Sequence, residues 1–163
     1  VNPHNEIDDN TKSAQIIISH VAYGLELAEK NGLPEKIKAF IRTHHGVNQA
    51  KYFYTMEQNK NPEVPLDPTP FTYPGPRPDT KETAILMMCD SVEAASRSVK
   101  EFTEENITNL VNKIIDGQVQ EGAFIKAPIT FAEIDKIKHT MIEKLKSMYH
   151  TRISYPELKK KQQ

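Results

Sequence analysis

Residues 59–79 read NKNPEVPLDPTPFTYPGPRPD, and seven of them are prolines. Proline lacks a backbone N–H and its ring clashes with a preceding helical turn, so this density excludes a helix or a central strand. The segment is predicted to be a long irregular loop, a kind of segment that is often functional. A linker between two domains is the alternative, but Leu66, Phe71 and Tyr73 supply apolar anchors that favour a packed loop.

Helix signals lie on both sides of this loop. Thr130 and Glu133 form a capping box, and Asn31-Gly32 and Gly46 supply helix stops. Strands are predicted nowhere except for at most a short pair near residues 124–125 and 129. The class is therefore all-α, with helices predicted over residues 12–30, 34–46, 48–58, 81–100, 103–121 and 130–150.

The whole chain fits a single globular domain. Its 163 residues, 37% hydrophobic and 26% charged, are enough for one hydrophobic core. We predict one domain over residues 1–155 and a frayed basic tail over residues 156–163. The net charge of -1 and the absence of a dense basic patch before the tail argue against a nucleic-acid partner.

The cysteine content and the termini bear on where the protein works. Cys89 is the single cysteine, which excludes an internal disulfide and suits a reducing compartment. No apolar stretch reaches the roughly 18 to 20 residues that a membrane-spanning helix needs. The chain begins with Val1 and not with methionine, so we expect it to be excised from a longer protein.

Two adjacent histidines occupy positions where apolar residues belong. Helical spacing places Ile37, Ile41, His44 and His45 on one stripe, while Lys38 is expected to project elsewhere. A single histidine on such a face is more often a hydrogen-bonded core residue than a metal ligand. Two in succession each need a partner for their buried nitrogens, and a metal ion is one such partner.

The first helix repeats this pattern. His20 lies on a stripe with Ile16, Gly24 and Leu27, which predicts that its imidazole points into the core. Core packing is the alternative for His20 alone. Gly24 removes a side chain one turn later, so that another backbone or a ligand can approach closely.

The helix after the loop supplies a carboxylate. Asp90 directly follows the apolar run of residues 84–89, and a buried carboxylate is costly unless it is paired or bound to a cation. A salt bridge to lysine or arginine is the alternative. Together with His20, His44 and His45, Asp90 makes a ligand set that suits zinc, manganese or iron.

Four segments carry a resemblance to a known family: Ser19-His20-Val21, Thr43-His44-His45-Gly46, residues 71–76 (FTYPGP) and residues 89–94 (CDSVEA). In this order they resemble the HD-domain phosphohydrolases, and most of all the cytoplasmic HD domain of bacterial seven-transmembrane HD receptors. Members of that family hydrolyse cyclic di-AMP to pApA. The resemblance covers residues 2–155 and implies an HD-domain-like helical bundle.

The resemblance also implies a centre of two divalent metal ions, iron or manganese. His20, His44 and His45 would bind one ion, and Asp90 would bind the other and take part in catalysis. Arg97 shares a helical face with Asp90 and is predicted to contact phosphate, although an ion pair with Glu93 or Glu101 is equally compatible with its position.

Two more substrate contacts are predicted. Lys81, at the start of the Asp90 helix, is a weaker candidate for a phosphate contact. Tyr73 is predicted to stack on a nucleotide base, because aromatic rings do so readily. The alternative is that Tyr73 only anchors the loop.

The chain departs from the family pattern at one point. It contains no His-Asp dipeptide, so the dyad and an upstream histidine are expected before Val1, and we expect little phosphodiesterase activity from this fragment alone. The parent is expected to be membrane-anchored, with this domain in the cytoplasm and able to form a homodimer. The alternative function is a non-catalytic metal- or nucleotide-binding module for regulation or dimerisation.

Overall fold

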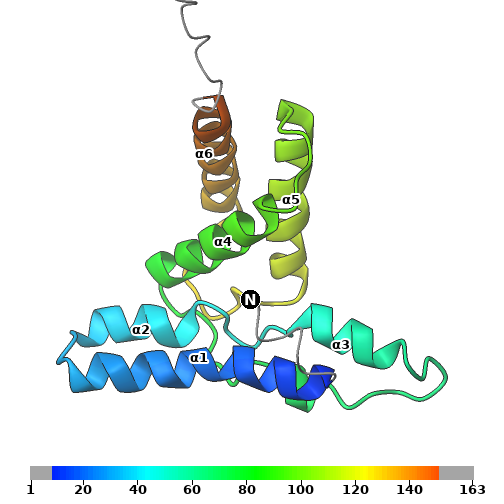
Figure 1. Cartoon of the computed structure of the whole chain (residues 1–163). Coiled ribbons are helices and arrows are strands. Elements are labelled where there is room, and N and C mark those ends of the chain that lie inside the picture. The colour runs from blue at the N-terminus through cyan, green and yellow to red at the C-terminus, as the bar shows by residue number, and fades with distance from the viewer. Residues whose placement is uncertain (1–8, 151–163) are drawn as a thin grey trace, which may run out of the picture. The chain divides into compact units, whose positions relative to one another are not determined.

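The computed structural model describes residues 9–150, with His150 described in its backbone only (Figure 1). The all-α prediction is confirmed. His4 and the predicted basic tail, residues 156–163, lie outside the described residues. The elements are α1 (Asn10–Lys30), α2 (Glu35–Thr43), α3 (Lys51–Gln58), a 3-10 turn η2 (Thr69–Phe71), α4 (Lys81–Ser96), α5 (Glu104–Gln120) and α6 (Phe131–His150).

Side-chain caps begin two of the helices, and the cap at Thr130 and Glu133 is the capping box that the sequence predicts. The Asp9 carboxylate accepts a hydrogen bond from the backbone N–H of Lys12 at 3.1 Å and begins α1. At the start of α6, the N–H of Glu133 bonds to Oγ1 of Thr130 at 3.2 Å, and the N–H of Thr130 bonds to the Glu133 carboxylate at 2.9 Å. Both oxygens therefore satisfy N–H groups that the helix leaves unpaired.

Two predictions of local structure need correction. α2 ends at Thr43, before Gly46, so both adjacent histidines lie in the turn after the helix. The short strand pair near residues 124–125 and 129 does not form, because residues 121–126 run through turns. Within residues 9–150 the isolated β-bridge pairs Gln49 with Thr72, and no helix there is long and apolar enough to cross a membrane.

The chain divides into two compact units. The first extends to Met87 and includes residues 118–129; the second contains residues 88–117 and continues from Thr130. The boundaries lie inside α4 and α5, which each contribute to both units. The assignment of residues 1–155 to a single domain stays a prediction.

Within the first unit, α1 packs against α2, α3 and η2, and α1 and α2 run side by side in opposite directions (Figure 1). The buried face of α1 carries the small residues Ala14, Val21 and Ala28. A Cβ added at Gly24 would lie 3.2 Å from Cγ2 of Ile41, so Gly24 accommodates the second helix, as predicted for a close approach.

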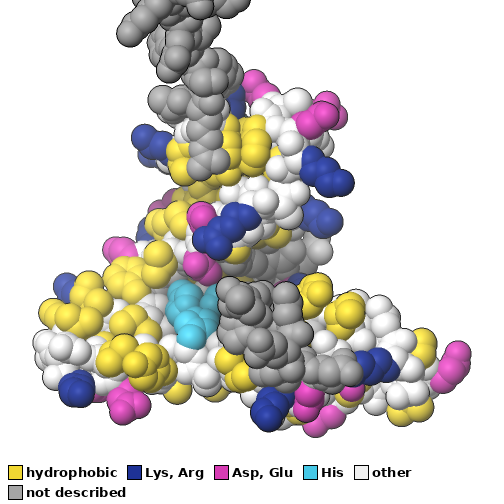
Figure 2. All heavy atoms as spheres, viewed as in Figure 1, with side chains coloured by type: hydrophobic (Ala, Val, Ile, Leu, Met, Phe, Trp, Pro, Cys, Tyr) yellow, Lys and Arg dark blue, Asp and Glu magenta, His cyan; other side chains and the backbone are white. Residues whose placement is uncertain are grey.

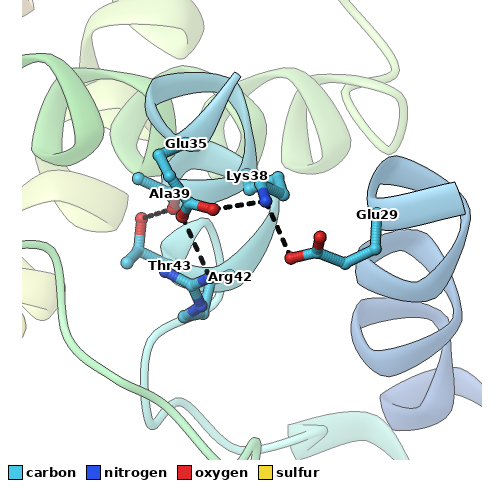
Figure 3. A network of polar contacts seen from close by, with 6 residues as sticks. All are labelled: Glu29, Glu35, Lys38, Ala39, Arg42 and Thr43. Atoms are coloured by element: carbon cyan, nitrogen blue, oxygen red, sulfur yellow. Dashed lines mark hydrogen bonds and ion pairs between the residues drawn. The ribbon is translucent and has the colours of Figure 1, made fainter. Parts of the chain in front are cut away.

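Lys38 ties α2 to α1, contrary to the expectation that it projects away (Figure 3). Its side chain is only 8% exposed, and its Nζ lies 2.7 Å from the carboxylate of Glu29 on α1. It also pairs with Glu35, one turn earlier on α2. Hydrogen bonds to Glu29 and Glu35 hold the pKa of Lys38 above its ordinary value. A long aliphatic stem lets lysine bury its chain while its charge stays paired.

The proline-rich loop packs on the first unit and does not link the two units. The N–H of Ala50 donates to the carbonyl of Phe71 at 2.7 Å, and the N–H of Tyr73 donates to the carbonyl of Asn48 at 2.9 Å. Phe71 is 1% exposed and Tyr73 is 6% exposed. These bonds and buried rings fix the end of the loop against the segment that follows the paired histidines.

The second unit is built from the C-terminal part of α4, most of α5, and α6. Its two long helices are joined by ion pairs at their edges, such as Lys138 with Asp116 at 2.6 Å and Lys146 with Glu104 at 3.0 Å. Its buried apolar side chains are Met88, Val92, Ile107, Val111, Ile115, Ile134, Met141, Ile142 and Leu145.

Candidate metal centre

Three histidines of the first unit lie together. His20 comes from α1, His44 ends α2, and His45 follows in the turn. One nitrogen of each ring lies within 4.8 Å of the others. Figure 2 shows histidine side chains gathered at the surface over α1 and α2, next to exposed hydrophobic side chains. The structure thus brings together three of the four predicted metal ligands.

Backbone carbonyls set the orientation of two of these rings. Nδ1 of His20 bonds to the carbonyl of Ile17, and Nδ1 of His44 bonds to the carbonyl of Ile41 at 2.7 Å. A carbonyl only accepts, so each Nδ1 carries the proton and, in a neutral ring, Nε2 is left with a bare lone pair. In metal sites, a hydrogen bond from Nδ1 to a carbonyl fixes the ring so that Nε2 points at the metal.

The two Nε2 atoms of His20 and His44 face each other at 3.1 Å. Two bare lone pairs repel at this distance, so a cation or a proton is needed between them. Bonds of about 2.0–2.1 Å from one metal place two ligand nitrogens about 3 Å apart. The donor set therefore fits a divalent metal ion.

His45 completes the triplet in a more enclosed position. Burial, aided by the nearby His44 and His20, lowers the pKa of His45 to about 4. The ring is therefore neutral at neutral pH, which is the form that binds metals. Its ring centroid lies 4.2 Å from that of Tyr73 with an interplanar angle of 26°, so the two rings stack.

Two glycines shape the turn that presents the paired histidines. Gly46 has φ 52 and Gly75 has φ 83, a backbone region that favours glycine. A Cβ at Gly75 would lie 3.1 Å from Cγ1 of Val47, so the loop approaches the turn closely here. The glycines therefore allow the loop to carry Tyr73 onto His45.

The prediction that His20 lies on a buried stripe is wrong. His20 is exposed, and so are Ile16 at 44% and Leu27 at 42%. α1 packs through its small residues, which allow close contact, and this leaves the stripe with the larger side chains on the open face. The paired histidines are half-buried. Helical periodicity grouped the stripe correctly but did not determine which face is covered.

Asp90 lies in the second unit, half-buried on α4. In the described part of the chain, the three histidines form the one group of three or more potential ligands that the geometry brings together. The run before Asp90 is not buried all round, since Ile85 and Leu86 are 36% and 38% exposed. The assignment of Asp90 as a ligand stays a prediction.

The predicted substrate contacts have different surroundings. The guanidinium of Arg97 donates to the carboxylate of Glu93 through Nε at 3.1 Å and through Nη2 at 2.8 Å. This is one of the two ion pairs that the sequence allowed as an alternative to a phosphate contact. Lys81 is exposed at the first position of α4. Tyr73 is buried, with its ring against His45, a contact that the sequence did not predict.

His139 has none of the features of the triplet. It is exposed on α6, and Nε2 lies 3.8 Å from the carboxylate of Asp135. Fold and site together define an all-helical protein with an oriented histidine triplet of metal-ligand geometry.

Comparison with curated proteins and solved structures identifies the family. No family model matches the chain. The chain is 38% identical over 160 residues to the cyclic-di-AMP phosphodiesterase PgpH of Bacillus subtilis, covering 98% of this chain and 22% of the relative. It is 40% identical over 157 residues to PgpH of Listeria monocytogenes, covering 96% of this chain and 21% of the relative. The chain thus spans about a fifth of the length of these curated relatives.

A solved structure agrees with these relatives. The HD domain of the L. monocytogenes phosphodiesterase PgpH, in complex with cyclic-di-AMP, matches with a TM-score of 0.85 and 38% identity. The match covers 91% of this chain and 68% of that chain. This chain belongs to the family of the PgpH HD domain, an HD-domain phosphohydrolase family.

Proposed function

We propose that this chain forms part of a metal-dependent phosphodiesterase site that hydrolyses a cyclic dinucleotide, cyclic di-AMP, to pApA. The observation that carries the metal site is the pair of Nε2 atoms of His20 and His44, which face each other at 3.1 Å with both Nδ1 atoms held by carbonyls. The relatives supply the reaction class, because they are cyclic-di-AMP phosphodiesterases.

The proposed cofactor is a divalent metal ion, which the geometry of the histidine triplet fits. We propose iron or manganese, held by His20, His44 and His45, with Asp90 binding a second ion of a two-metal centre. When bound, divalent cations act as Lewis acids toward a phosphate ester and lower the pKa of water. Imidazole nitrogens suit iron, and carboxylate oxygens suit manganese.

The chain's own residues have distinct tasks in this proposal. The carbonyls of Ile17 and Ile41 keep two Nε2 lone pairs directed into the site. Tyr73 covers one face of the His45 ring, and its burial excludes water from that face. Both contacts reduce the rotational freedom that the ligands lose when a metal binds.

Three side chains are proposed to act on the substrate. Arg97 would exchange the carboxylate of Glu93 for a phosphate, to which a guanidinium can donate two parallel hydrogen bonds. Lys81 is the second proposed phosphate contact. The buried Tyr73 is proposed to border the base through its edge, since its face lies against His45. We also propose a membrane-anchored parent with this domain in the cytoplasm, capable of forming a homodimer.

Metal analysis tests the site directly. The purified chain is stripped with a chelator, incubated with Mn²⁺ or anaerobically with Fe²⁺, desalted and analysed by mass spectrometry of the metals. We expect His20→Ala, His44→Ala and His45→Ala each to lose bound metal. His139→Ala is the matched control, because His139 is exposed and belongs to no group of three or more potential metal ligands among the described residues.

The reaction is tested in the longer parent protein with cyclic di-AMP as substrate. We expect metal-dependent formation of pApA in the wild-type and His139→Ala proteins and none in His45→Ala. Full retention of metal in all three triplet variants would refute the metal site. Metal and cyclic di-AMP bound without turnover would instead support the non-catalytic nucleotide-binding module.

A further inference from the structure

A cavity of about 500 Å³ lies in the second unit, between the C-terminal part of α4 and the end of α6. Its floor is apolar and is formed by the buried side chains of Val92, Met141 and Leu145. Its volume lies within the range of small-molecule sites, which are mostly apolar with a few polar groups at the edge. All residues that line it belong to the second unit, and no histidine of the triplet is among them.

The wall of the cavity is aromatic. The rings of Phe102 and Tyr149 stack with centroids 3.4 Å apart and an interplanar angle of 15°. Phe102 is 37% exposed, so part of its ring faces open space. The stack holds both rings in a fixed plane, and a fixed aromatic plane favours a second planar ring beside it.

The mouth of the cavity carries a net positive charge. Arg97 and Glu93 line it, but their ion pair is neutral as a whole. Lys144 also lines it, is exposed, and forms no ion pair with any side chain among residues 9–150. The charge that remains for a ligand is therefore that of one ammonium group, which complements one anionic group.

From this wall, floor and charge we infer that the cavity binds a small planar aromatic anion, such as a nucleoside monophosphate. The ring of the ligand lies on the apolar floor beside Phe102, and its anionic group reaches Lys144. One stacked ring and one charge contact suit a weakly bound ligand, with a dissociation constant in the millimolar range. The inference does not depend on the proposed metal site.

Cys89 allows a direct test. It is the single cysteine of the chain and lies on the cavity wall with an accessible thiol. The probe is adenosine 5′-monophosphate, added at millimolar concentration to the chelator-treated protein. The rate of Cys89 alkylation by iodoacetamide is followed by mass spectrometry. We expect the nucleotide to slow alkylation severalfold, and adenosine or inorganic phosphate alone to slow it much less.

Two variants and one control locate the protection. We expect Lys144→Glu to weaken protection about tenfold or more, because it replaces an attraction with a repulsion. Phe102→Leu should weaken it by loss of the aromatic wall. Lys136→Glu is the matched control, an exposed lysine of the same helix that does not line the cavity.

The proposal is overturned by any of three results. The first is that neither adenosine 5′-monophosphate nor naphthalene-1-sulfonate, a second planar aromatic anion, changes the rate of alkylation. The second is that adenosine protects Cys89 as well as its monophosphate does. The third is that protection is equal in the wild-type, Lys144→Glu and Phe102→Leu proteins. Because chelator is present throughout, failure here leaves the metal site untouched, and loss of metal binding leaves this result untouched.

Discussion

Replacing Tyr73 by leucine is expected to weaken metal binding although Tyr73 contributes no ligand to the predicted set. The tyrosine ring stacks on His45 with centroids 4.2 Å apart, and it also meets His20 edge-on at 6.0 Å. Aromatic pairs of this kind contribute about 0.5–1.5 kcal/mol beyond the area that they bury. If this energy orients His45 for a metal, its loss raises the metal dissociation constant about twofold to tenfold.

Isothermal titration calorimetry with Mn²⁺ on the chelator-treated protein measures this change. Tyr73→Phe keeps the ring and should stay within about twofold of the wild type. Phe71→Leu is the matched control: Phe71 is buried in the same loop, but its ring meets Tyr54 at 5.6 Å and none of the described histidine rings. It should lower the melting temperature and leave the metal dissociation constant unchanged.

The result that refutes this reasoning is specific. If Tyr73→Leu binds Mn²⁺ as tightly as the wild type while it is folded by circular dichroism, the stack does not orient His45. If Phe71→Leu weakens binding as much as Tyr73→Leu does, the effect is a general loss of stability. If Tyr73→Phe is as weak as Tyr73→Leu, the hydroxyl and not the ring is responsible.

Three further predictions concern stability and reactivity. Lys38→Met should lower the melting temperature, measured by calorimetry, more than Lys136→Met does, because it removes the ion pairs that join Lys38 to Glu29 on α1 and to Glu35 on α2. Gly46→Ala and Gly32→Ala should each cost about 1–2 kcal/mol in denaturant unfolding, since φ is 52 and 63, but only Gly46→Ala should also weaken Mn²⁺ binding. Burial, with a smaller effect of the adjacent Asp90 carboxylate, raises the pKa of the Cys89 thiol, so the thiolate forms at higher pH than in a free thiol. Alkylation at pH 8.5 should be slower than for glutathione, and Asp90→Asn should shift the pH midpoint downward; an unchanged midpoint would contradict the electrostatic cause.

Local signals in the sequence determined where several helices begin. Asp9 and Thr130 act within one turn of their own position, and the prolines of residues 59–79 exclude regular hydrogen bonding wherever they occur. These effects depend on neighbours in the chain, so they can be derived without knowledge of the fold. The grouping of His44 with His45 is of the same kind, because adjacent residues stay close in any fold.

Only the tertiary structure decided which faces are covered and how the ligands are oriented. The stripe with His20 looked buried from its spacing, but α1 packs through Ala14, Val21 and Ala28, whose small side chains allow close contact. Lys38 looked exposed by residue type and is buried, because Glu29 comes within 2.7 Å from another helix. The stack of Tyr73 on His45 joins residues 28 positions apart through the fold of the loop. Spacing along a helix groups side chains on a face, whereas burial and pairing depend on which other elements meet that face.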